Sequence, residues 1–234
     1  NIGVPDSPTL SGSYITNDTT PDISGTIAAE DIGSTIKVYA ENGTLLAEKV
    51  TTGTSWTITS SDYESGQSIA EGSETLTVTA TDNTGESNPA SLAITVDTTA
   101  PTPTITASGG IDSGDRTNDG SLTLTFTSNE ATTNLTDGDI TVIGGTLSAW
   151  SATGTTDTTY EATFTSTGGD GLKTIQINGS QFTDTAGNSN LASNSFEWTY
   201  DSSAPKQPTI SASQNPTNDT TPELTISSDP NTSV

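Results

Sequence analysis

The stretch Thr75-Leu76-Thr77-Val78-Thr79-Ala80-Thr81 decides the fold. It places Leu76, Val78 and Ala80 on one face of an extended chain and four threonines on the other. A period of two residues is typical of a β-strand with one face in a core and the other in water. The β-branched threonine favours such a pleated, half-exposed surface. We therefore expect this segment to be a strand of an antiparallel sheet.

The same alternation returns along the chain, and no segment has a convincing helical period. Apolar rows of this kind are Leu92/Ile94/Val96, Leu122/Leu124/Phe126, Tyr160/Ala162/Phe164 and Phe196/Trp198/Tyr200. About seven short strands in about 100 residues, with turn residues between them, are typical of an immunoglobulin-like sandwich. The predicted fold is all-β: tandem immunoglobulin-like β-sandwich domains arranged as an extended rod.

Internal repeats set the domain organisation. Thr16-Asn17-Asp18 returns as Thr117-Asn118-Asp119, and the segment from Asp97 to Pro101 returns from Asp201 to Pro205. The offset of about 100 residues predicts two full repeats, 1–100 and 101–204, and the opening of a third at 205–234. Because the third copy stops early, we expect the parent chain to continue.

Composition excludes most enzyme classes and several kinds of partner. Lys plus Arg is 5 and Asp plus Glu is 29, so the net charge is −24, which excludes nucleic acid as a partner. The chain has neither Cys nor His, so it lacks the usual nucleophile pairs and zinc ligands. No apolar run approaches the roughly 18 residues that span a bilayer, so no direct membrane insertion is expected. We expect a protein that is not an enzyme.

The residues resemble a known family. The segment 16–26, the Ser55-Trp56-Thr57-Ile58 run and the segment 76–82 look like the bacterial Ig-like repeats of giant surface adhesins, of the biofilm-associated and type I-secreted kinds. Repeat 2 resembles a sister subfamily through its segments 122–131, 138–148 and 182–188. Repeat 1 departs from the pattern at Asn83-Thr84-Gly85-Glu86, where the family usually has Ala-Gly-Asn. The resemblance implies a bacterial surface protein with calcium at its linkers.

Acidic and Asn residues recur at strand ends and form the candidate metal site. In an immunoglobulin sandwich, Asn17, Asp18 and Asp97 should gather at the end of repeat 1 that faces repeat 2. Asp184, Asn188 and Asn129 should gather at the facing end of repeat 2. Converging carboxylates repel each other unless a cation lies between them, and Ca²⁺ binds six to eight oxygens. The alternative is that these residues only form Asx turns and strand caps.

The predicted structural calcium ligands are therefore assigned to three junctions. Asp18 and Asp97 are expected at the first junction, joined by Asp184 from the next repeat. Asp119 and Asp201 are expected to do the same at the second. Asp82, together with Asp6, is expected to serve the junction before repeat 1.

Three functions remain open from the sequence. The first is a spacer in a stalk of an extracellular bacterial surface protein, which projects a distal binding region and contacts only neighbouring repeats. The second is a subunit of a self-assembling extracellular filament or surface layer, with other copies of itself as partners. The third is a carbohydrate-binding accessory module of a secreted enzyme. Trp56 and Trp198 are in phase with core residues, whereas Trp150 is out of phase with Leu147 and is the candidate sugar-stacking residue.

Overall fold

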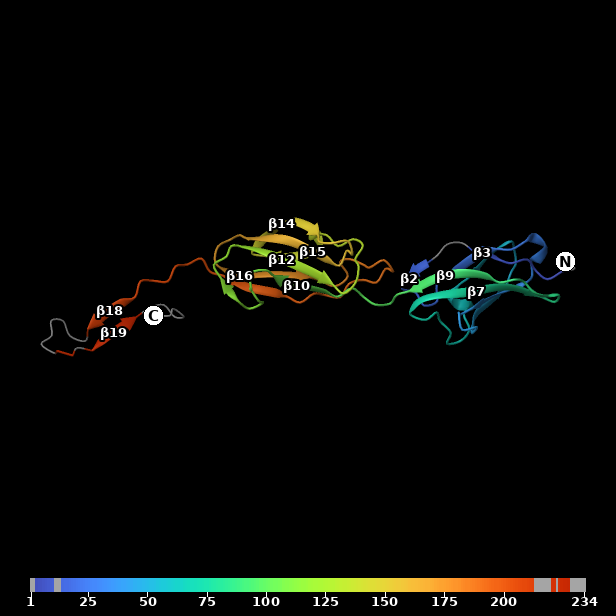
Figure 1. Cartoon of the computed structure of the whole chain (residues 1–234), viewed down its shortest axis with the longest axis horizontal. Helices are drawn as coiled ribbons and strands as arrows, with labels where there is room; N and C mark the ends of the chain where they lie inside the picture. The colour runs from blue at the N-terminus through green and yellow to red at the C-terminus, as the bar shows by residue number, and fades with distance from the viewer. Residues whose placement is uncertain (1–2, 11–13, 213–219, 222, 228–234) are drawn as a thin grey trace.

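The computed structural model describes residues 3–10, 14–212, 220–221 and 223–227. Two β-sandwiches stand end to end and are followed by a strand pair (Figure 1). The alternation of apolar residues and threonine that predicts strands in the sequence produces strands throughout. In the described residues the only helices are three single turns of 3-10 helix: η1 (Ala29–Asp31), η2 (Ser60–Asp62) and η3 (Asp137–Asp139).

Repeat 1 is a sandwich of two sheets. One sheet has the order β1-β3-β6 and the other has the order β2-β9-β7-β4-β5, with β8 paired to β7. The bounds are β1 (Thr9–Leu10), β2 (Tyr14–Thr16), β3 (Ile23–Thr26), β4 (Thr35–Tyr39), β5 (Leu45–Val50), β6 (Ser55–Ile58), β7 (Gly72–Asp82), β8 (Gly85–Glu86) and β9 (Ala90–Val96). The short β2 pairs in parallel with β9, whereas β1 belongs to the opposite sheet.

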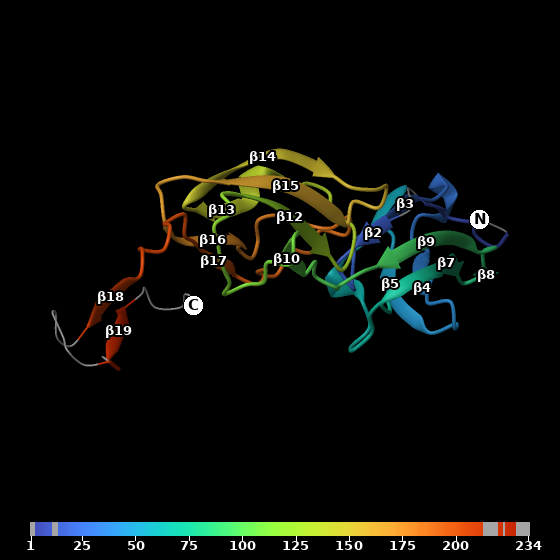
Figure 2. The same ribbon diagram turned by 60° about the vertical axis from the view of Figure 1, so that its left-hand side comes forward.

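Repeat 2 has the same plan with one strand in a different sheet. Its sheets have the orders β10-β12-β15-β14 and β11-β17-β16-β13. The bounds are β10 (Pro103–Ala107), β11 (Arg116–Thr117), β12 (Ser121–Ser128), β13 (Ile140–Ile143), β14 (Gly145–Ala152), β15 (Thr159–Ser166), β16 (Gly171–Ile177) and β17 (Phe196–Tyr200). The strand β14 pairs with β15, whereas its counterpart β5 in repeat 1 pairs with β4. The layers of both repeats are visible in Figure 2.

The apolar rows fill two separate cores, as the alternation predicts. Leu76 and Val78 are fully buried in the first core, and Phe126 and Trp198 are 1% exposed in the second. Trp56 is also buried. Trp150 is partly buried, because its indole stacks on Tyr160 with ring centroids 5.2 Å apart and also contacts Phe126. The indole of Trp150, which the sequence marks as the candidate sugar-stacking ring, therefore packs against the second core.

Beyond residue 204, the structure describes a single pair of strands. These are β18 (Thr209–Ala212) and β19 (Leu224–Ser227), which run antiparallel and are exposed. Residues 213–219, 222 and 228–234 of the predicted opening of a third repeat lie outside the described residues. The domain boundaries 1–100, 101–204 and 205–234 remain predictions.

Candidate cation site at the junction of the repeats

The two sandwiches meet at the ends that the sequence predicts to face each other. The amide of Asn17 donates to the Ala186 carbonyl at 3.1 Å. The side-chain amide of Asn188 donates to the Asp97 carbonyl at 2.7 Å. These two hydrogen bonds join the end of repeat 1 to the loop that follows β16 in repeat 2, so the junction is a direct contact between domains.

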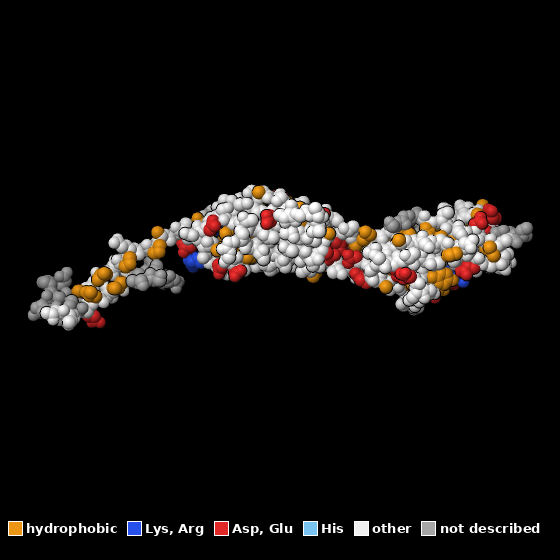
Figure 3. All heavy atoms as spheres, in the orientation of Figure 1, with side chains coloured by type: hydrophobic (Ala, Val, Ile, Leu, Met, Phe, Trp, Pro, Cys, Tyr) orange, Lys and Arg blue, Asp and Glu red, His pale blue; other side chains and the backbone are white. Residues whose placement is uncertain are grey.

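Three carboxylates from different segments converge at this contact. One oxygen each from Asp97, Glu130 and Asp184 lies within 4.8 Å of the other two. Asp97 follows β9, Glu130 follows β12, and Asp184 lies in the loop between β16 and β17. Asp184 is buried and the other two are half-buried. Acidic side chains gather visibly between the two sandwiches (Figure 3).

The local hydrogen bonds hold these carboxylates in place. Asp184 accepts from the amides of Gly187 and Asn188 through Oδ1, and from the Asn188 side chain through Oδ2 at 2.8 Å. Asp97 Oδ1 accepts from the Thr99 amide at 3.0 Å. Asn188 therefore contacts both Asp184 and the backbone of Asp97, which fixes the spacing across the junction.

The electrostatics of the cluster are unfavourable without a counter-charge. Burial, together with the charges of Asp97, Asp184 and Glu71, raises the pKa of the Glu130 carboxyl. The two ion pairs in the described part of the chain, Lys49–Asp62 and Arg116–Asp201, involve none of the three carboxylates. Mutual repulsion therefore disfavours the fully charged state of these three carboxyls.

The structure brings together two of the three predicted ligands of the first junction. Asp97 and Asp184 meet, and Glu130 joins them in place of Asp18. Asp18 instead forms an Asx turn, in which its Oδ1 accepts from the Thr20 amide at 2.8 Å. The sequence reasoning missed Glu130, although it directly follows Asn129, a residue that it placed at this junction. Asn129 itself accepts a hydrogen bond from the Thr102 amide.

The predicted ligands of the second junction lie at the far end of repeat 2. Asp119 Oδ1 accepts from the Ser121 amide at 3.0 Å, as Asp18 does in repeat 1. Asp201 Oδ1 accepts from the Ser203 amide, and its Oδ2 lies 2.7 Å from Nη1 of Arg116. These two residues are not part of the three-carboxylate group.

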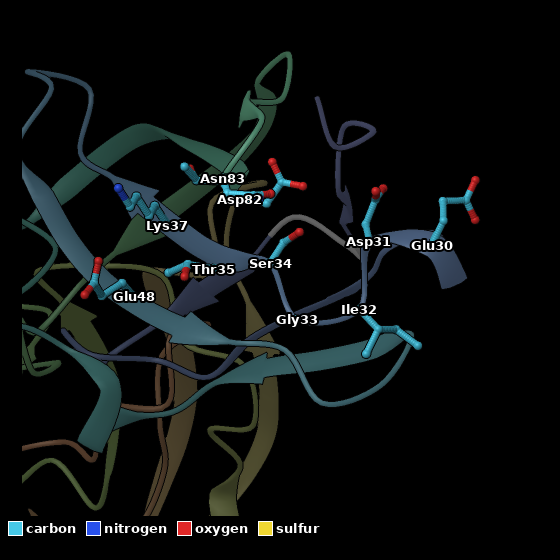
Figure 4. A pocket seen from close by; sticks show the side chains of 11 residues that line it. Glu30, Asp31, Ile32, Gly33, Ser34, Thr35, Lys37, Glu48, Asp82 and Asn83 are labelled. Atoms are coloured by element: carbon cyan, nitrogen blue, oxygen red, sulfur yellow. The ribbon is translucent and has the colours of Figure 1, made fainter. Parts of the chain in front are cut away.

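The remaining predicted ligand lies at the outer end of repeat 1. Asp82 lines an open hollow with Glu30 and Asp31 (Figure 4). Its Oδ1 accepts from the amide and hydroxyl of Thr84, and these hydrogen bonds lower the pKa of Asp82. Asp6 contributes its amide, which donates to the buried Asp31 carboxylate at 2.9 Å. Within the described residues this end holds no group of three converging carboxylates.

Comparison with known proteins identifies the two sandwiches. Residues 5–98 match one family model and residues 97–200 match another, and both are described as a bacterial Ig-like domain. No curated protein matches the chain. Among the described residues, no helix is long and apolar enough to cross a membrane.

The chain also matches solved structures of other proteins at low sequence identity. The fibronectin(III)-like modules of Clostridium thermocellum CbhA are 16% identical, with 82% of this chain and 93% of that chain covered and a TM-score of 0.33. Yersinia pseudotuberculosis InvD is 14% identical, with 89% and 63% covered and a TM-score of 0.37. Invasin, an integrin-binding bacterial protein, is 13% identical, with 88% and 42% covered and a TM-score of 0.32. The two family matches, the all-β sandwiches and the repeat in the sequence agree, and this chain contains two adjacent bacterial Ig-like domains.

Proposed function

We propose that this chain is a spacer segment of an extracellular bacterial surface protein, and that calcium at the junction of its two repeats stiffens it. The observation that carries the proposal is the convergence of Asp97, Glu130 and Asp184 across the contact between the domains. The resemblance to adhesin repeats agrees with this role. The work of such a segment is mechanical: it holds a distal binding region away from the cell.

The donor set fits a hard cation. All three ligand atoms are carboxylate oxygens, which are the ligands that Ca²⁺ prefers. Two oxygens that share an ion with bonds of about 2.3–2.6 Å can be at most about 5.2 Å apart. All three pairs meet that limit, since they lie within 4.8 Å. Water and further protein oxygens would complete the coordination.

A bound ion would change the mechanics of the junction because the ligands belong to both domains. Asp97 ends repeat 1, whereas Glu130 and Asp184 belong to repeat 2. Without the ion, the mutual repulsion of the carboxylates pushes the two ends apart. With it, attraction to the ion replaces that repulsion, and the buried Pro101 restricts the linker further.

Calorimetry and small-angle scattering of the whole chain test the proposal. We expect calcium to bind with measurable heat, and the maximum dimension and flexibility to change when excess chelator is added. Asp97→Asn and Asp184→Asn should abolish both effects. Glu161→Gln, which removes an exposed charge from the middle of β15, is the matched control and should leave them unchanged. A chain that binds no calcium, and scatters identically in calcium and chelator, overturns the proposed role of the metal.

The solution mass tests the spacer role separately from the metal. A spacer should remain a monomer at high protein concentration, since its partners are the neighbouring repeats of its own chain. Concentration-dependent association in sedimentation would favour the filament or surface-layer subunit instead.

A further inference from the structure

The last strand of each sandwich stops pairing at the same register. In repeat 1, Gly72 at the start of β7 pairs with Val96, the last residue of β9. In repeat 2, Gly171 at the start of β16 pairs with Tyr200, the last residue of β17. An aspartate, two hydroxyl residues, an alanine and a proline follow in both repeats. The segments in which the chain leaves the two sandwiches can therefore be compared residue by residue.

The short strand beside each of these segments is also placed alike. The strand β2 pairs in parallel with β9, and β11 pairs in parallel with β17, with Ile15 and Arg116 at matching positions. The carbonyl of the next residue accepts from the amide of the following aspartate, Asp97 or Asp201, at 2.9 Å in both repeats. The backbone of each leaving segment is thus held as far as its aspartate.

A carboxylate holds the next residue of repeat 1. Glu71 directly precedes Gly72, and its two oxygens both accept from the Thr98 amide at 3.1 Å. Its Oε2 also accepts from the Thr98 hydroxyl at 2.6 Å. The backbone pairing stops at Gly72, which has a φ of +102 to +104° at this turn. The Glu71 side chain therefore continues the pairing with a charged acceptor, which forms stronger hydrogen bonds than a neutral one.

Repeat 2 makes the same contact with a shorter acid. Asp170 directly precedes Gly171, and its Oδ1 accepts from the Ser202 amide at 2.8 Å and from the Ser202 hydroxyl at 2.7 Å. Its Oδ2 accepts from the Ser203 hydroxyl at 2.6 Å. The hydrogen bonds from Ser203 and Ser202 lower the pKa of Asp170 to about 2. The contact thus recurs at one structural position with different residues, which indicates a common role.

The second sandwich holds the first linker from its other side. The Leu191 amide donates to the carbonyl of the buried Pro101 at 2.8 Å. The Thr102 amide donates to Oδ1 of Asn129. Glu71 therefore ties the linker to repeat 1 at residue 98, and repeat 2 ties it again from residue 101. Two residues lie between these attachments, so the contact of Glu71 limits the directions in which the linker can leave repeat 1.

We propose that the Glu71 carboxylate is a clasp that sets the direction in which the chain leaves repeat 1, and that Asp170 is the equivalent clasp of repeat 2. The clasp consists of protein groups alone, so this inference goes beyond the proposed function and does not depend on calcium. Part of the stiffness of the joint is then built into the repeat that precedes it.

A pair of substitutions at Glu71 tests the clasp. Glu71→Ala and Glu71→Gln both remove the charge, which also contributes to the raised pKa of Glu130. Only Gln keeps an oxygen that can accept from Thr98, so the difference between the two variants isolates the hydrogen bonds. Glu64→Ala, which removes an exposed charge elsewhere in repeat 1, is a further control. Amide hydrogen exchange by NMR and small-angle scattering are measured on the whole chain in excess chelator.

We expect the Thr98 amide to exchange about tenfold or more faster in Glu71→Ala than in the wild type, because it loses a charged acceptor. Amides of the first core should be unaffected. Glu71→Gln should recover most of the protection, and Glu64→Ala all of it. Scattering should show a broader distribution of dimensions for Glu71→Ala alone. If Glu71→Ala fails to fold, Thr98→Val, which removes the hydroxyl and keeps the amide, should give a smaller effect of the same sign.

Two results would overturn the inference. A Thr98 amide that exchanges equally fast in the wild type and in Glu71→Ala shows that the clasp does not form in solution. Faster exchange with unchanged scattering shows that the clasp does not direct the linker. Either result leaves the calcium proposal standing, because chelator is present throughout and calcium binding is measured separately by calorimetry.

Discussion

Replacing Glu130 by Gln should stabilise the calcium-free chain and, at the same time, weaken its binding of calcium. Gln keeps the shape of the side chain and an oxygen that can accept from the Asn129 amide, as Glu130 does at 3.2 Å. What it removes is one negative charge from the group formed with Asp97 and Asp184. The two effects have opposite signs, and a residue with only a packing role would not produce both.

The size of the stabilisation follows from the spacing of the oxygens. Two charges 4.8 Å apart repel by about 0.9 kcal/mol in water and by about 3.5 kcal/mol at an effective dielectric constant of about 20. Because Glu130 is half-buried, and salt at about 0.15 M screens over about 8 Å, values near the water limit apply. We expect about 1 kcal/mol, which shifts the melting temperature of a domain of this size by about 4–8 °C.

The stabilisation of the calcium-free chain by Glu130→Gln should depend on pH. The pKa of Glu130 is raised in the folded chain, so the folded state holds the proton more tightly than the unfolded state does. The stability associated with this proton is complete below the ordinary Glu pKa and is lost as the pH rises through the raised value. The advantage of Glu130→Gln over the wild type should therefore be largest at neutral pH and vanish in acid.

Thermal unfolding of the wild type and the variant is followed in chelator and in calcium between pH 3.5 and 8. It measures the change in melting temperature, its dependence on pH and its dependence on calcium. Glu161→Gln controls for the change in net charge alone. In saturating calcium the order should reverse, because binding to the folded state stabilises the wild type by about 2.7 kcal/mol at 100 times the dissociation constant. A variant that is less stable than the wild type in chelator at neutral pH would refute the electrostatic reasoning.

Three further predictions concern the sandwiches. Phe126→Ala should cost about 3–5 kcal/mol in denaturant titration, because the ring is 1% exposed in the second core; a variant that melts like the wild type would contradict the assigned strand phase. Gly145→Ala should cost about 1–3 kcal/mol, because its new methyl group would lie 2.1 Å from the Phe164 ring, whereas Gly53→Ala meets no atom within 4 Å and should be tolerated. In chelator the two repeats should unfold in separate transitions by calorimetry, since their cores share no residue; one two-state transition for the whole chain would contradict this.

The sequence predicts the cores well because alternation directly encodes which face of a strand points inward. It does not encode which neighbour a strand chooses at a sheet edge. Leu45–Val50 and Gly145–Ala152 occupy the same place in the order of strands, yet one joins β4 and the other joins β15. Periodicity reports which side chains face inward but not which sheet an edge strand joins, so it does not distinguish the two arrangements.

The candidate site is harder to predict because turns and cation sites favour the same residues. Asp18, Asp97, Asp119 and Asp201 are equally conspicuous in the sequence, and each accepts an amide hydrogen bond from a residue two positions later. Such a turn uses one oxygen and satisfies the local backbone, whatever lies beyond it. The repeated aspartates are therefore fully explained as turn formers, and their recurrence alone does not identify a metal site.

What distinguishes Asp97 is the charge of the groups that face it from outside its own turn. Glu130 and Asp184 come from the next domain and add negative charge, whereas at the equivalent Asp201 the neighbouring strand supplies Arg116. Neither contact follows from spacing within one repeat, because the first crosses a domain junction and the second depends on a single strand residue that is Ile in one copy and Arg in the other. The same turn thus faces two further carboxylates in one repeat and an arginine in the other, and residues outside the turn make the difference.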